Sequence, residues 1–244
     1  MNQNFNNPVK EFFDRPFYLE RGRHVIEVRE MVLRELLGEV NHAKILDLGC
    51  GDGSLSIPFL NPTNELTMVD LSPRMIEIAG GRIPDHMRDR VNLINAPIDQ
   101  IESLESYDIV ICVGLLAHVP SIDAAIKKIA QCMKLGAVAV IEFTPNPNPI
   151  GKFLLPYYML RRFLAGDQQG YTTNKMPLKQ LMQITLSHGL SLTRVRRHLF
   201  PIPTMGFWPY GWIRRYVRFT FNNSIFSRIG TEHIMLFTKI KHVE

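Results

Sequence analysis

The chain has 244 residues, of which 45% are hydrophobic and 21% are charged. This composition is typical of a globular protein with a full core, and it excludes disordered and fibrous chains. No apolar run approaches the roughly 18 to 20 residues of a membrane-spanning helix, and the first residues lack a secretory signal pattern, so we expect a cytoplasmic protein.

The first predicted element is a helix within residues 8–40, where apolar side chains recur at helical spacing until Gly38. Short apolar runs then alternate with helical segments. Runs rich in Val and Ile without strict alternation are typical of strands buried on both faces. The strands are predicted at 44–48, 66–69, 91–94, 108–113, 136–143, 190–200 and 233–240, with a helix over 177–187. The pattern predicts an α/β doubly wound domain.

A glycine-rich motif follows the first predicted strand. The stretch ILDLGCGDGSLS covers residues 45–56 and places glycines at alternate positions, which lets backbone N–H groups approach a ligand closely. Asp47 precedes the first of these glycines by two residues and favours a ligand with an ammonium group. Asp70 ends the second strand, where a carboxylate can accept hydrogen bonds from both ribose hydroxyls of a nucleoside. Together they predict an adenosine-like ligand, and a purely structural turn is the alternative.

These motifs resemble those of the class I S-adenosylmethionine-dependent methyltransferases. The resemblance rests on ILDLGCGDG at 45–53, VDLSPRMIEIA at 69–79, YDIVICVGLLAHVP at 107–120 and MKLGAVAVIEF at 133–143. It implies a seven-stranded, mostly parallel sheet in the order 3-2-1-4-5-7-6 with the last strand antiparallel. It also implies S-adenosyl-L-methionine as the cofactor.

By the same resemblance, Asp47 would hold the amino group of the cofactor and Asp70 its ribose diol. Pro97 stands where relatives often carry an acid that meets the adenine amine, so Ile98 N–H and Asp99 are the expected replacements. The cofactor-binding residues implied in this way are Asp47, Gly49, Gly51, Asp70, Leu71, Met75, Ile98, Asp99 and Val113.

Methyl transfer depends mainly on holding the acceptor in line with the S–CH3 bond in a site that excludes water, so its catalytic signature is faint. His118, five residues beyond Val113, is the candidate base, because imidazole titrates near neutrality. A surface or helix-capping role is the alternative. The cysteines Cys50, Cys112 and Cys132 show no metal-ligand spacing, so we expect no metal site.

Charge is divided unevenly: residues 1–143 carry a net charge of −6 and residues 144–244 carry +11. Within the second part, segments at about 144–176 and 201–231 combine aromatic, aliphatic and arginine residues, and the second contains both Trp208 and Trp212. We expect a single domain in which residues 1–143 hold the N-terminal helices and the cofactor-binding core. Residues 144–244 complete the sheet, with the two segments as helical insertions that form a cap over the acceptor. Packing as the cap's own core or as a dimer interface is the alternative.

This composition indicates an amphipathic small molecule, or a lipid-linked or sugar-containing acceptor, methylated on oxygen or nitrogen, and peripheral contact with an anionic membrane. The end of the fourth strand lacks the Asn/Asp-Pro-Pro-aromatic motif of the family's adenine, cytosine-N4 and glutamine N-methylating members, which argues against nucleic acid as the acceptor. A methyltransferase-fold scaffold, or an RNA-binding protein that uses the basic second half, is the alternative function.

Overall fold

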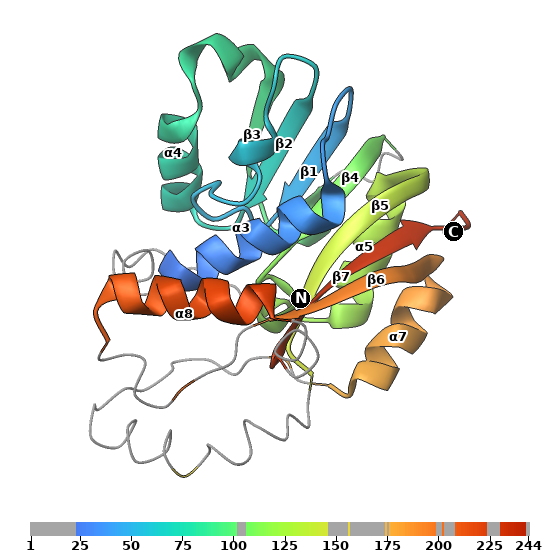
Figure 1. Cartoon of the computed structure of the whole chain (residues 1–244). Coiled ribbons are helices and arrows are strands. Elements are labelled where there is room, and N and C mark those ends of the chain that lie inside the picture. The colour runs from blue at the N-terminus through green and yellow to red at the C-terminus, as the bar shows by residue number, and fades with distance from the viewer. Residues whose placement is uncertain are drawn as a thin grey trace.

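The computed structural model describes residues 23–101, 106–145, 156, 174, 176–198, 202, 208–223 and 230–242. Within these ranges one sheet has the strand order β3-β2-β1-β4-β5-β7-β6, with helices on both faces (Figure 1). Strand β7 pairs antiparallel with β5 and β6, and the other pairings are parallel. The predicted doubly wound fold and strand order are therefore confirmed.

The central strands are buried on both faces, which explains their nearly continuous apolar sequences. In β4, for example, Val110 and Cys112 face one hydrophobic cluster, while Ile109 and Ile111 face the other. The strands are β1 (Lys44–Leu48), β2 (Glu65–Asp70), β3 (Val91–Asn95), β4 (Tyr107–Cys112), β5 (Met133–Phe143), β6 (Leu190–His198) and β7 (Glu232–Lys239).

The start of strand β5 was predicted three residues too late. The strand begins at Met133, which pairs with Tyr107 before the register between β4 and β5 shifts. Gly136 lies within it with a φ of +80°. A glycine in the left-handed region interrupts the strand pattern, so the sequence alone indicates a boundary there.

Among the described residues, three helices cover one face of the sheet: α3 (Arg23–Leu37), α4 (Pro73–Arg82) and α8 (Tyr210–Asn222). Two cover the other: α5 (Ile122–Cys132) and α7 (Leu178–Ser187). Gly38 ends α3 as predicted, with a φ of +65° and an N–H donated to the Arg34 carbonyl. In the described part of the chain, no helix is both long and apolar enough to span a membrane.

Strands β5 and β6 each pair antiparallel with β7, so they run in the same direction. Their carboxyl ends therefore lie at the same edge of the sheet as those of β1 to β4, and both predicted insertions leave from this edge. Most of the first insertion lies outside the described residues. In the second, α8 lies alongside α3 over the face of the sheet (Figure 1). The cap over an acceptor stays a prediction.

Candidate functional site

A pocket of about 920 Å³ opens where β1 to β4 end. Doubly wound sheets bind ligands at this edge. Four strand-end turns line it. The lining residues are Leu48, Gly49, Gly51, Val69, Asp70, Leu71, Ser72, Met75, Ala96, Pro97, Ile98, Asp99, Val113, Gly114, Leu115, His118, Val119 and Pro120.

The pocket brings together every predicted site residue except Asp47, which lies behind the glycine turn and is absent from the lining. Sequence reasoning missed the apolar part of the wall, namely Leu48, Val69, Ala96, Leu115, Val119 and Pro120, as well as Ser72. Apolar residues beside strand ends carry no signal that separates a pocket wall from ordinary core. Ser72 is the N-cap of the following helix, and its Oγ accepts the Met75 N–H at 3.2 Å.

The glycine turn leaves the floor of the pocket uncovered. Gly49 and Gly51 have φ values of +74° and +54°, in the left-handed region that favours glycine. A Cβ added to Gly49 would stand 3.1 Å from Leu115 Cδ1, whereas one added to Gly51 would meet no protein atom within 4 Å. Because Gly51 lines the pocket, that open space belongs to the ligand site.

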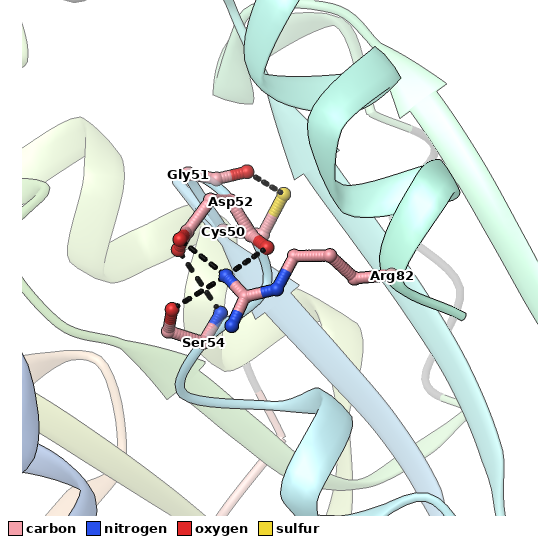
Figure 2. Close-up of polar contacts among 5 residues, drawn as sticks. All are labelled: Cys50, Gly51, Asp52, Ser54 and Arg82. Atoms are coloured by element: carbon pink, nitrogen blue, oxygen red, sulfur yellow. Dashed lines mark hydrogen bonds and ion pairs between the residues drawn. The ribbon is translucent and has the colours of Figure 1, made fainter. Parts of the chain in front are cut away.

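Arg82, at the end of α4, holds the far side of this turn. Its Nη1 donates to the Asp52 carbonyl at 3.0 Å and to Ser54 Oγ at 2.7 Å, and it pairs with the Asp52 carboxylate. Figure 2 shows the guanidinium pointing into the loop from the neighbouring helix. This contact ties the β1 turn to the helix that follows β2, so the two walls of the pocket are fixed relative to each other.

Asp70 joins the same two turns from inside the pocket. Its Oδ2 accepts the Gly51 N–H at 2.9 Å, and its Oδ1 accepts the Ser72 N–H at 2.9 Å. A carboxylate oxygen can accept more than one hydrogen bond, so these two bonds do not exclude contacts with a ligand in the pocket. The predicted functional role and the structural alternative are therefore compatible at this residue.

Asp47 is buried, with 2% of its surface exposed, and its Oδ2 has no hydrogen-bond partner in the described part of the protein. Burial raises the pKa of its carboxyl to about 7, helped by the charges of Asp70 and Asp52 and opposed by the Ser56 hydroxyl. A buried acceptor without a partner is costly. A cationic group bound at the glycine turn would lower that cost.

The wall opposite the glycine turn comes from the ends of β2 and β3. Met75 is fully buried and Leu71 lies beside it, which provides an apolar surface for a flat ring. Asp99 is exposed at the rim. Asn95 was not predicted, yet its side-chain amide donates to the Asp70 and Leu71 carbonyls at 2.9 and 3.0 Å and fixes this wall.

His118 ends a one-turn 3-10 helix, Leu116–His118, after β4. Burial and the nearby Arg29 charge lower the pKa of its imidazole to about 4, so the ring is neutral at pH 7. Asn174, from the first insertion, donates its backbone N–H to the Ala117 carbonyl at 2.9 Å, and its side chain donates to the Val119 carbonyl. Asn174 thus holds the loop that carries the candidate base.

A buried ionic network lies beside this loop. Arg29 of α3 contacts Glu142 of β5 through two nitrogens, at 2.8 and 2.6 Å, and His198 of β6 lies 3.4 Å from the same carboxylate. Burial would raise the pKa of Glu142, but the Arg29 and His198 charges hold it below its usual range. Sequence reasoning missed this network, although an acid inside the apolar run VIEF was a signal.

The guanidinium of Arg29 also reaches the pocket wall. Its Nη1 lies 3.6 Å from the Cβ position of Gly114. In the described ranges, no cluster of three or more His, Cys, Asp or Glu side chains is placed to hold a metal ion. The site is therefore a cavity with one neutral imidazole and a paired cation at one end.

Comparison with known proteins agrees with this geometry. Residues 46–139 match the model of a family described as a methyltransferase domain. The chain is 27% identical over 182 residues to a ubiquinone biosynthesis O-methyltransferase of Leptothrix cholodnii, covering 72% of this chain and 76% of that protein. It is 27% identical over 104 residues to the enzyme of the same name from Rickettsia canadensis, covering 43% and 44%.

The fold is also similar to the crystal structure of magnesium protoporphyrin IX methyltransferase from Synechocystis PCC 6803 with bound S-adenosylhomocysteine. The TM-score is 0.66 at 15% identity, over 97% of this chain and 100% of that one. At that identity the likeness concerns the fold alone. The chain spans less than half the length of several of the curated relatives that it matches.

Proposed function

We propose that this chain, a class I S-adenosylmethionine-dependent methyltransferase by domain and fold, transfers a methyl group from S-adenosyl-L-methionine to a hydroxyl oxygen of an amphipathic small molecule. Oxygen is favoured over nitrogen because the curated relatives in the comparison are named O-methyltransferases. Lipid-linked and quinone-like acceptors are the first to test, because those relatives are named for ubiquinone biosynthesis.

The observation that carries this proposal is the pocket formed by the glycine turn and Asp70. Asp70 holds acceptor oxygens at one end of the cavity, and the open Gly51 backbone lies next to it. Asp47 supplies a buried carboxyl whose Oδ2 has no hydrogen-bond partner in the described part of the chain. A ribose diol fits the position of Asp70, and an ammonium group fits that of Asp47. The open Gly51 backbone leaves room for the part of the ligand between them.

S-adenosylmethionine supplies an electrophilic methyl group on a positively charged sulfur when it is bound. The chain's own residues contribute position and a dry environment. Val113, Leu115 and Val119 give the pocket an apolar lining near His118. The neutral His118 imidazole can accept the hydroxyl proton of the acceptor, and the Arg29 charge, balanced by Glu142, fixes the wall beside it.

Isothermal titration calorimetry with S-adenosylmethionine and S-adenosylhomocysteine tests the cofactor part. We expect saturable binding of both, with affinity at least about tenfold weaker for Asp70→Asn, because a charged acceptor of the diol is lost. Arg88→Ala, at an exposed position in the 3-10 helix before β3, serves as the control. No heat of binding at saturating cofactor would contradict the proposal.

Methyl transfer to catechols with and without a long alkyl chain, measured as S-adenosylhomocysteine formation, tests the acceptor part. A preference for the alkylated compounds supports an amphipathic acceptor. Activity only on amines would contradict oxygen as the accepting atom. The alternative function, an RNA-binding or scaffold protein, is not favoured, because it gives no role to an intact cofactor pocket.

A further inference from the structure

We propose that the outer face of helix α8 docks on an anionic lipid surface. The inner face of this helix is accounted for, since Ile213 and Val217 are buried against the sheet. The outer face carries Trp212, 70% exposed, and Phe219, 58% exposed. These two residues are seven positions apart, so they lie on the same side of the helix two turns from each other.

The charges on α8 have one sign. The helix sequence YGWIRRYVRFTFN contains three arginines and no acidic residue. Arg214 pairs with Glu27 at 3.2 Å, whereas Arg215 and Arg218 form no ion pair with any other described residue. Arg215 falls between Trp212 and Phe219 on the exposed side. Aromatic side chains interleaved with arginine are the composition of helices that lie in the headgroup layer of anionic membranes.

Charge argues against the nearest alternative occupant, a second copy of this chain. Two identical α8 faces would bring Arg215 and Arg218 of both copies together, and such like-charge contacts oppose association. A lipid surface with anionic headgroups complements the same arginines and takes up the aromatic rings. We therefore infer that a lipid surface covers the outer face of α8. Self-association or RNA binding through this face would overturn the proposal.

Helix α8 is also joined to the pocket wall through α3. Tyr210 Oη donates to Glu27 at 2.6 Å, and the Arg23 guanidinium lies 5.5 Å from the centre of the Tyr210 ring. Arg29, two residues beyond Glu27 on the same helix, reaches Gly114 of the pocket. A docked α8 would thus hold the pocket close to the lipid layer, where amphipathic compounds concentrate. The docking itself requires no methyl transfer.

The two tryptophans allow a direct measurement. Trp208 lies edge-on to Tyr216, with ring centres 5.8 Å apart, and is partly buried. Trp208→Phe leaves Trp212 as the only tryptophan of the chain. On addition of phosphatidylglycerol-containing vesicles, we expect its emission to shift to shorter wavelength and to be quenched by brominated acyl chains. Phosphatidylcholine vesicles should give neither change.

Vesicle co-sedimentation of the otherwise unaltered protein tests the charges. Arg215→Glu with Arg218→Glu, and separately Trp212→Ala with Phe219→Ala, should each weaken binding at least about tenfold. Lys127→Glu with Lys179→Glu changes the charge equally on α5 and α7, on the opposite face of the sheet, and should leave binding unchanged.

The proposal is overturned if the unaltered protein does not sediment with anionic vesicles. It is also overturned if the charge reversals on α8 and the control reversals on α5 and α7 weaken binding equally. It is also overturned if the Trp212 shift depends on protein concentration without lipid, which indicates self-association, or appears only with RNA. Cofactor titration of the α8 variants should be unchanged, so failure of the docking and failure of the proposed function give different results.

Discussion

Asp47 has a carboxyl pKa raised to about 7 by burial, whereas an aspartate in the unfolded chain titrates near 4. The folded state therefore holds the proton more tightly, and its stability decreases as pH rises from about 4 to about 7. We predict that Asp47→Asn stabilises the ligand-free protein, by about 1 to 3 kcal/mol more at pH 8 than at pH 5. Urea unfolding at the two pH values measures this difference. An equal gain in unfolding free energy at both pH values would contradict the raised pKa of Asp47.

Gly51 allows cofactor binding to be separated from stability. Alanine at its φ of +54° is strained by roughly 1 to 2 kcal/mol, and the added methyl group would occupy pocket space. We predict that Gly51→Ala weakens S-adenosylmethionine binding at least about tenfold. Gly38→Ala is the matched control, since Gly38 has a φ of +65° and equally open surroundings at the end of α3. Equal affinities for the two variants would contradict a ligand at the glycine turn.

The Arg29–Glu142 pair links α3 to β5 across the core, and both side chains are largely buried. Glu142→Gln leaves the guanidinium without its charge partner, so we predict a loss of about 2 to 4 kcal/mol in unfolding free energy. The double variant Arg29→Met with Glu142→Leu should be more stable than Glu142→Gln. Chemical denaturation measures both.

The exposed Arg88–Asp85 pair provides the control for this prediction. Arg88→Met should cost less than about 1 kcal/mol, because solvent screens an exposed pair. If Glu142→Gln costs no more than Arg88→Met, the buried network does not fasten α3 to the sheet.

The elements were predictable where their signal is local. Strand β1 has the predicted bounds, and most other strand ends differ from prediction by one or two residues, because strands buried on both faces give continuous apolar runs. The place of α8 was not predictable in this way. Its hydrogen bond from Tyr210 to Glu27 joins residues 183 positions apart, and no local pattern records such a contact.

The same distinction holds for the site. Gly49, Gly51 and Asp70 follow strand ends in a recognisable motif, so they could be placed at the pocket from sequence. The Arg29–Glu142–His198 network was missed, because its members lie on three separate elements that only the folded sheet brings together. Asp47 was expected to hold the amino group of the cofactor; it is buried on β1 and is absent from the pocket lining, so this role stays a prediction.

The chain as a whole should be sensitive to acid. His118 and His233 have pKa values lowered to about 4, mainly by burial, against about 6.5 when unfolded. The unfolded chain therefore binds more protons below pH 6.5, and stability falls as pH decreases from there to about 4. We predict that the unfolding free energy of His233→Gln, relative to that of the unaltered chain, is higher at pH 5 than at pH 8 by about 1 to 2 kcal/mol.

Thermal unfolding at the two pH values measures this prediction. His86→Gln, at an exposed position, is the control. If His233→Gln and the unaltered chain lose the same stability between pH 8 and pH 5, His233 is not held neutral in the fold.

The reversed direction of β7 has a consequence for how proteins of this architecture diverge. Because β7 returns antiparallel between β5 and β6, the segments after Phe143 and after His198 both begin at the edge of the sheet where the pocket lies, while the glycine turn and Asp70 belong to earlier strands. Insertions or exchanges in these segments leave the pairing of the first four strands intact. Changes in these segments, in evolution or by loop grafting, can thus alter the methyl acceptor while the strands that bind the methyl donor stay unchanged.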